Sequence, residues 1–169
     1  MTGMTDLAMT EVKRRLFDAF REDHARLGRA LHALGERLRA EDVAGAREVA
    51  ETLDREAGAH IAFEEFDFYP ALLPFLSRDE IDAMHLEHSE ALALLGDMKQ
   101  LGDGALGERS LRDALLDRVQ AMERHVSDCG ELFGVMGGLD AAAQRHLLER
   151  LDEWRGRAPR WSELATIPN

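Results

Sequence analysis

Apolar residues recur at steps of three and four over most of the chain, which is the spacing of helices that bury one face. The first stripe begins after Thr10, a residue type that caps helix N-termini, and a charged turn over 37–42 ends it. Its inward positions are Phe17, Phe20, His24, Leu27, Leu31, Leu34 and Leu38. The first ten residues lack such a pattern, and a loose arm is expected there.

A second stripe runs over about 43–69, where Pro70 and Pro74 break the helix. Its inward positions are Val49, Leu53, Ala57, His60, Glu64 and Phe68. Ser77 followed by Glu80 predicts a capping box that opens a third helix. The third stripe consists of Ile81, His85, His88, Leu92 and Leu95.

A glycine-rich loop over 102–107 precedes a fourth helix, for which Ser110 and Asp113 predict the N-terminus. Gly137 and Gly138 end that helix. Its inward positions are Leu115, Val119, Met122, His125, Cys129, Leu132 and Met136. A short fifth helix is expected from Asp140 to about residue 154, before an irregular tail.

This order predicts an all-α fold, an antiparallel up-down-up-down four-helix bundle with a short C-terminal fifth helix. No strand pattern competes with it. The expected organisation is a flexible N-terminal arm over residues 1–10, the bundle over 11–138, and a C-terminal helix and tail over 139–169.

Composition and charge limit the classes of function that this chain can have. The 169 residues include 33 acidic and 21 basic side chains, a formal charge of −12 that argues against binding nucleic acid or an anionic membrane surface. No apolar run approaches the roughly 20 residues of a membrane span, and the N-terminus lacks the pattern of a signal peptide. Cys129 is the only cysteine, which fits a reducing compartment. A cytoplasmic protein is expected; nothing in the sequence names a protein partner.

His60 and Glu64 are the most informative pair. Four residues apart, they share one helical face with about 6 Å between their Cβ atoms. Apolar Phe63, Phe66 and Phe68 surround them. A buried carboxylate beside a buried imidazole is costly unless a partner such as a metal ion compensates for the lost hydration.

Three more histidines fall at the same level of the bundle. His24 lies 17 residues before Glu41 in the first turn, and His60 lies 19 residues after it. His88 and His125 match across the other two turns with the same mismatch of two residues, about 3 Å of helix rise. One histidine on an apolar stripe is more often a hydrogen-bonded core residue than a ligand, but four beside a glutamate favour a metal site.

The ligand types favour iron, zinc, manganese or copper, and five ligands exceed what one tetrahedral zinc needs, so a dinuclear centre is favoured. Glu-x-x-His and His-Glu-x-x-His are both absent, which excludes ferritin-type centres and the common zinc proteases. His32 and His146 lie off the inward stripes and are expected at the surface.

With these residues the chain resembles the hemerythrin-like (HHE cation-binding) domain family. The matching segments are Arg21-Glu22-Asp23-His24, the run from His60 through Glu64-Glu65 to Tyr69-Pro70, Leu86-Glu87-His88 and His125-Val126. The resemblance covers roughly residues 15 to 136. It implies that His24, His60, Glu64, His88 and His125 hold non-haem iron, as two ions, with zinc or manganese as alternatives. It also implies a small diatomic or peroxide ligand (oxygen, peroxide or nitric oxide), or a role in iron handling.

Two departures from the family pattern concern the ligands. The family usually has a carboxylate four or five residues after the histidine of helix four, where this chain has Cys129 and Gly130. Asp128 or Cys129 would then complete the shell, or Cys129 is a small buried hydrophobe. His85 is an additional candidate, as a ligand or as a hydrogen-bond donor behind the ligands.

Two functions follow. The first is a metal-binding protein that binds or senses the small ligand, with peroxide or nitric-oxide turnover as an enzymatic version. The second is a non-catalytic regulatory or interaction bundle with one structural ion or none. The first is the preferred function, and the missing carboxylate is the feature that keeps the second open.

Overall fold

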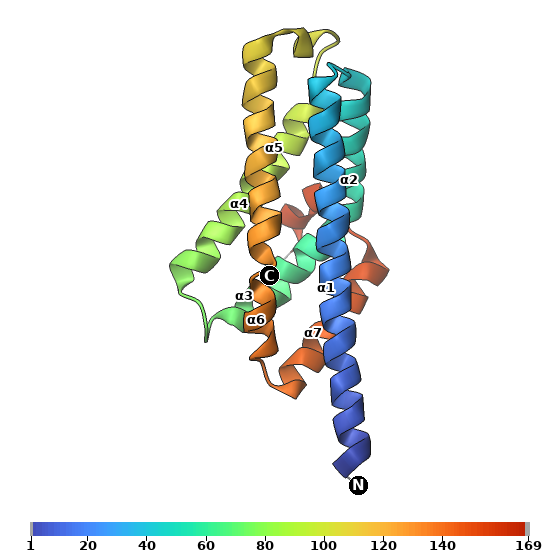
Figure 1. Ribbon diagram of the computed structural model, residues 1–169, viewed down its shortest axis with the longest axis vertical. Helices are drawn as coiled ribbons and strands as arrows, with labels where there is room; N and C mark the ends of the chain where they lie inside the picture. Colours follow the sequence, from blue (N-terminus) through green and yellow to red (C-terminus); the bar gives the residue numbers. More distant parts are fainter. Residues whose placement is uncertain (1, 168–169) are drawn as a thin grey trace.

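The chain folds into a four-helix bundle, seen in a computed structural model that describes residues 2–167 (Figure 1). The bundle consists of α1 (Thr2–Arg39), α2 (Val43–Phe63), α4 (Arg78–Lys99) and α5 (Arg109–Cys129). Helix α1 packs against α2 and α5, while α4 packs against α2 and α5, which gives the up-down-up-down order. The predicted all-α fold with an additional C-terminal helix is confirmed.

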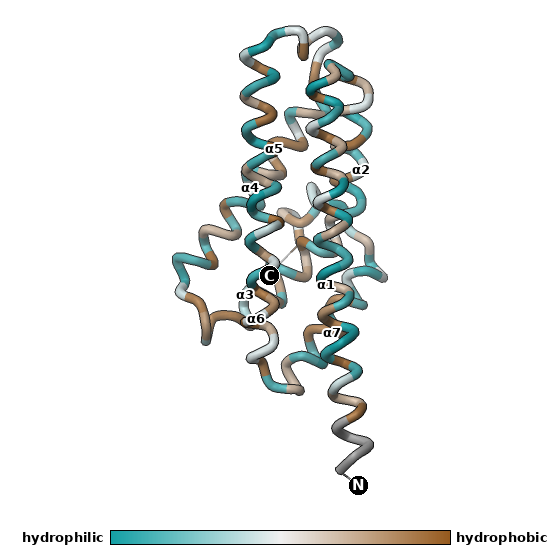
Figure 2. Tube along the Cα trace, in the orientation of Figure 1, coloured by the Kyte–Doolittle hydropathy of each residue, from teal (hydrophilic) through white to brown (hydrophobic). Residues whose placement is uncertain are grey.

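Short elements connect and flank these helices. They are the π-helix η1 (Glu64–Phe68), α3 (Tyr69–Leu72), the 3-10 helix η2 (Ala105–Gly107), α6 (Leu132–Gly137), α7 (Ala141–Arg157) and the 3-10 helix η3 (Trp161–Thr166). Along α1, α2 and α5, polar and apolar residues alternate in the manner of amphipathic helices (Figure 2). A longer apolar stretch follows α3, where Leu73 and Phe75 are exposed. None of the helices within residues 2–167 combines the length and the apolar character that crossing a membrane requires.

The first helix is longer than expected. It begins at Thr2 rather than after Thr10, so the segment expected as a loose arm is helical and projects beyond the bundle (Figure 1). No proline interrupts these residues, and the helix propagates outward from its buried part although Leu7 and Met9 are exposed. Whether this extension is flexible stays a prediction.

Pro70 does not end the second helix. The chain stays helical from Val43 to Leu72, with η1 inserted before the proline. The Tyr69 amide donates to the Glu64 carbonyl five residues earlier. Because the proline ring would clash with the carbonyl four residues before it in a regular α-helix, the wider π turn gives it room. The same turn contains Glu64.

The other helix ends were predicted with mixed success. The capping box is confirmed: the Ser77 amide donates to Glu80 Oε2 (2.8 Å), and the Glu80 amide donates to Ser77 Oγ (3.2 Å). The fourth helix instead begins at Arg109 with Glu108 as its N-cap residue, and the Ser110 hydroxyl donates to Glu108 Oε1 (2.8 Å). It also breaks at Gly130, which divides the predicted helix into α5 and α6.

The tail is not irregular. Helix α7 continues to Arg157, three residues beyond the expected end, and η3 follows after Ala158 adopts a left-handed conformation. Residues 158–166, the C-terminal strap, pack along α2. Trp161 and Leu164 of this strap are buried. The strap therefore belongs to the core that surrounds the predicted site.

Candidate metal centre

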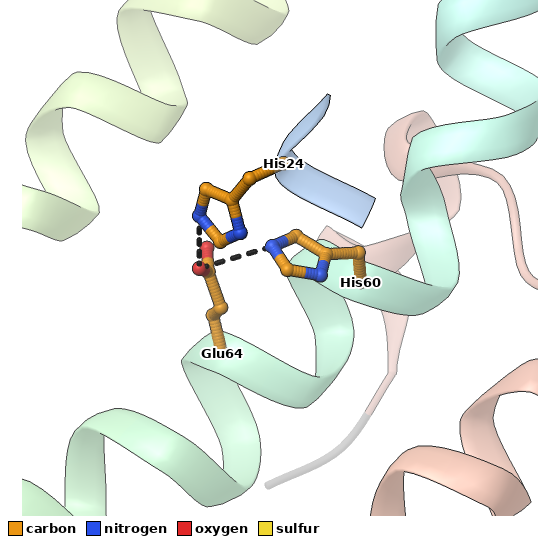
Figure 3. Close-up of side chains that lie close together, drawn as sticks. All are labelled: His24, His60 and Glu64. Carbon is orange, nitrogen blue, oxygen red and sulfur yellow. Dashed lines mark hydrogen bonds and ion pairs between the residues drawn. The ribbon is translucent and has the colours of Figure 1, made fainter. Parts of the chain in front are cut away.

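Glu64 lies at the centre of the predicted cluster, with 1 % of its surface exposed. Its Oε1 atom is 3.1 Å from His60 Nε2 and 3.5 Å from His24 Nε2 (Figure 3). Its Oε2 atom lies on another side, 3.2 Å from His88 Nε2 and 3.3 Å from the Tyr69 hydroxyl, which donates to it. The two carboxylate oxygens thus contact different sets of side chains.

His125 and Cys129 complete the second set. Cys129 Sγ is 3.4 Å from His125 Nε2, since the two residues are one turn apart on α5. Two groups of side chains place one ligand atom each within 4.8 Å of the others: His24, His60 and Glu64, and Glu64, His125 and Cys129. Glu64 is common to both groups.

The four histidines share one orientation. Each ring places Nδ1 against an oxygen acceptor and so leaves Nε2 directed toward the cluster. The acceptors are the Phe20 carbonyl for His24 (2.8 Å), Asp23 for His60 (3.1 Å), Glu65 for His88 (2.8 Å) and Glu87 for His125. An acceptor on the far nitrogen fixes the tautomer and ring orientation and raises the basicity of the near nitrogen, as is usual for metal-binding histidines.

Opposite charges within the cluster shift the pKa values of its buried groups. Burial alone would lower the pKa of His60, but Glu64 and Asp23 outweigh burial and raise that pKa to about 9. Burial would likewise lower the pKa of His88, but Glu64 and Glu65 outweigh burial and raise that pKa to about 9. Burial would raise the pKa of Glu64, but the two imidazoles hold it well below its ordinary value. The glutamate is therefore an anion, as a metal ligand must be.

The pKa values of three other groups in the cluster shift in a different way, those of His24, Tyr69 and Cys129. Burial, together with the charge of His60, lowers the pKa of His24 and keeps this ring neutral. Burial and the negative charge of Glu64 raise the pKa of the Tyr69 hydroxyl and of the Cys129 thiol. Both groups are thus protonated in the metal-free cluster, and a metal bound to either would have to displace its proton.

Helix α7 supports the cluster from outside. Arg155 donates to Asp23 Oδ1 (2.9 Å), and the other oxygen of Asp23 accepts from His60. Two other α7 side chains, Arg150 (2.9 Å) and the indole of Trp154 (2.7 Å), donate to Asp67 in the π turn. These contacts join α7 to α1 and to the π turn, so the orientation of His60 depends on a helix that follows the bundle.

The C-terminal strap covers a further side. Buried Asp54 on α2 accepts from the Ser162 amide (2.7 Å) and hydroxyl (2.9 Å), from Lys99 (2.7 Å) and from Arg160 (3.2 Å). A Cβ atom on Gly58 would lie 1.9 Å from the Pro159 carbonyl oxygen, so only glycine permits this close approach. The ring of Trp161 then lies edge-on to His88, with centroids 6.0 Å apart.

The structure brings most of the predicted ligands together. His24, His60, Glu64, His88 and His125 converge, and Cys129 joins them. The two remaining candidates lie outside. Asp128 is exposed, because it precedes Cys129 by one residue and so faces about 100° away on α5. His85 is half-buried against the edge of the Tyr69 ring, with centroids 5.3 Å apart. His32 and His146 are exposed, as expected.

Several functional side chains were missed by sequence reasoning. Asp23, Glu65 and Glu87 each stand next to a predicted ligand in the sequence, and each holds the histidine of a different helix. An acidic residue directly next to a predicted ligand in the sequence is the signal that could have identified these three residues. Arg155 and Trp161 had no comparable signal, because only the docking of the C-terminal segment brings them to the centre.

The donor set fits a metal ion. Zinc-like ions lie about 2.0–2.2 Å from nitrogen and oxygen ligands, so two ligands of one ion are roughly 3–4 Å apart. The 3.1 Å and 3.5 Å separations between Glu64 and the rings of His60 and His24 are in this range. Imidazole and carboxylate suit iron, zinc and manganese, and the thiol adds a softer ligand on one side.

Comparison with known proteins gives one match. The family model described as "Hemerythrin HHE cation binding domain" matches residues 15–133, which include every candidate metal ligand that the structure brings into the cluster. Neither the curated proteins nor the solved structures contain a match to this chain. The match ends before α7 and the C-terminal strap.

Proposed function

Because the chain belongs to the hemerythrin HHE cation-binding domain family, we propose that its buried cluster is a non-haem di-iron centre that binds oxygen, peroxide or nitric oxide. The family makes it a cation-binding helical protein; iron, the number of ions and the small ligand are the proposal. Zinc and manganese are the alternative metals.

The disposition of Glu64 is the observation that supports two ions. One oxygen faces His24 and His60, and the other faces His88, with His125 and Cys129 beyond it. A carboxylate with a separate set of donors at each oxygen is arranged to bridge two ions. His24, His60 and Glu64 would then hold one ion, and Glu64, His125 and Cys129 the other, with His88 Nε2 3.2 Å from Glu64 Oε2.

Bound iron would supply an open coordination position and a redox-active electron source for the small ligand. The protein supplies the surroundings. Tyr69 stays protonated because burial and Glu64 raise its pKa, so its hydroxyl is available as a hydrogen-bond donor beside the second set of ligands. Phe20, Phe63 and Phe68 are fully buried around the cluster and keep bulk water from it.

Metal analysis combined with absorption spectroscopy tests the proposal. Protein produced in iron-containing medium should carry two irons per chain and show ligand-to-metal bands that change on reduction and on adding peroxide or nitric oxide. Zinc as the only metal, or less than one metal per chain, would contradict a di-iron centre.

A second candidate function is a regulatory or interaction bundle with one structural ion or none. Its support is that, within residues 2–167, every buried side-chain nitrogen and oxygen has a hydrogen-bond partner without any ion. The cluster can therefore persist as a network of ion pairs. Iron-free protein that keeps its unfolding temperature, and that takes up no metal when iron is offered, would favour this function.

A further inference from the structure

A groove of about 560 Å³ opens between α4 and α5 on the side of His125. Its wall contains Glu87, Glu90 and Asp128, together with small side chains such as the exposed Ala93 and Ala121. Small side chains on facing helices leave the space between them unfilled.

The groove ends next to the cluster. A second cavity, of about 10 Å³, is lined by His24, His60, Glu64, His88 and His125. Ala91, Met122 and His125 line both spaces. These three shared side chains lie between the groove and the inner cavity, which has room for about one water molecule. Met122 is unbranched and has three rotatable bonds, so it can change rotamer more easily than a β-branched residue.

The other sides are closed more tightly. The depression between α1 and α2 that reaches His60 measures only about 30 Å³. The C-terminal strap covers the side of His88 with Trp161, which also lines the inner cavity. A hollow of about 590 Å³ near Pro70 and His85 contains no residue that lines the inner cavity. Of these three spaces, the groove between α4 and α5 is the largest that shares lining residues with the inner cavity.

The charge of the groove matches a cation. Its wall carries three carboxylates and two arginines, a formal charge of 2 − 3 = −1, with Arg118 paired to Asp97 (2.6 Å) and Glu87 paired to His125. A local excess of negative charge concentrates cations and accelerates their association. Carboxylate oxygens on a wide, wet surface exchange hydrated divalent cations without trapping them.

We infer that the α4/α5 groove is the route by which metal cations reach the centre, with Met122 and His125 as its inner barrier and Glu90 and Asp128 collecting cations at its mouth. This inference rests on the proposed metal-binding function. It gives Asp128, which the sequence suggested as a ligand, a role on the path to the ligands.

Cobalt(II) uptake by metal-free protein tests the route, followed by stopped-flow absorption of the bound ion. Ala121→Trp fills the groove at an exposed position, and Ala30→Trp makes the same change in the depression between α1 and α2 as a matched control. The Ala121 variant should take up cobalt about tenfold more slowly, with unchanged final stoichiometry, because binding then requires an additional opening step. The Ala30 variant should keep the wild-type rate.

A second pair of variants tests the charges. Glu90→Gln with Asp128→Asn should slow uptake about tenfold at low ionic strength, and salt should remove the difference. Asp82→Asn with Asp117→Asn removes two exposed carboxylates from the same helices outside the groove and should have a smaller effect. Circular dichroism checks that all variants are folded.

The outcomes separate the two proposals. Normal cobalt binding with an unchanged rate in Ala121→Trp would overturn the route and leave the metal centre standing. Slow uptake in Ala30→Trp alone would also overturn it and would assign access to the α1/α2 side. A wild-type protein that binds no cobalt would refute the metal centre and the route with it.

Discussion

His60 and His125 stand on opposite sides of the same centre, and each donates a hydrogen bond from Nδ1 to a carboxylate. Asp23, the partner of His60, is 11 % exposed and is itself held by Arg155. Glu87, the partner of His125, is 51 % exposed and lines the α4/α5 groove. The same motif is therefore rigid and dry on one side and accessible to water on the other.

The difference has a structural origin in the C-terminal segment. Helix α7 supplies Arg155 to the α1/α2 side, whereas the lining of the groove between α4 and α5, among the described residues, comes from those two helices alone. A hydrogen bond to a charged group in a dry environment stabilises more than an exposed ion pair, which water and salt screen. We expect the closed side to determine stability and the open side to determine exchange.

Removing the residue common to both sides should have the largest effect. Glu64→Ala leaves two buried imidazoles without their shared carboxylate, and breaking a buried pair costs roughly 3–5 kcal/mol. Both ions of the proposed centre should be lost. Glu65→Ala, which removes only the acceptor behind His88, is the comparison: it should weaken metal binding by about 10–100-fold but keep metal when the metal is in excess. Denaturant unfolding and metal analysis measure both effects; an unchanged metal content in the Glu64 variant would remove it from the centre.

The two supporting carboxylates should differ when neutralised. Asp23→Asn should cost about 1.5–3 kcal/mol of unfolding free energy, since it weakens charged hydrogen bonds to His60 and Arg155. Glu87→Gln should cost only about 0–1 kcal/mol because its carboxylate is exposed. Asp23→Asn should also lower metal affinity by about 10–100-fold in a chelator competition. Equal losses in the two variants would mean that the two sides are equivalent.

A substitution at Gly58 should displace the C-terminal strap from α2. Gly58→Ala puts a methyl group 1.9 Å from the Pro159 carbonyl oxygen. Overpacking should cost about 1–3 kcal/mol and outweigh the roughly 1 kcal/mol by which alanine favours a helix over glycine. Gly96→Ala is the matched control, because a Cβ atom there has no neighbour within 4 Å, and it should stabilise the protein. Thermal unfolding and tryptophan fluorescence report both; a stabilised Gly58 variant would show that the strap is not closely seated.

The smallest effect on stability is expected for Cys129→Ser. A buried hydroxyl in place of the thiol should cost about 1 kcal/mol, because His125 remains as its hydrogen-bond partner. If Cys129 is a ligand of the second ion, this variant should lose metal on that side only and retain the ion at His24 and His60. Metal counts per chain decide between partial loss and no change, and full retention would make Cys129 a packing residue.

Much of the fold and part of the site could be predicted from local pattern. The order of helices and the level at which the histidines meet depend on helix period and turn position, which are properties of neighbouring residues. The helix boundaries were less accurate, since the π turn before Pro70 and the break at Gly130 satisfy backbone and packing requirements together.

The sequence by itself determined an all-α bundle and the convergence of His24, His60, Glu64, His88 and His125, because a period of 3.6 residues places each of them on an inward face. Only the tertiary structure decided which acidic neighbour holds which ring, that Asp128 faces the groove, and that Arg155 and Trp161 reach the centre. Those contacts join segments far apart in the chain. They depend on how each helix is rotated and where the C-terminal strap docks, which only the packing of the whole molecule specifies.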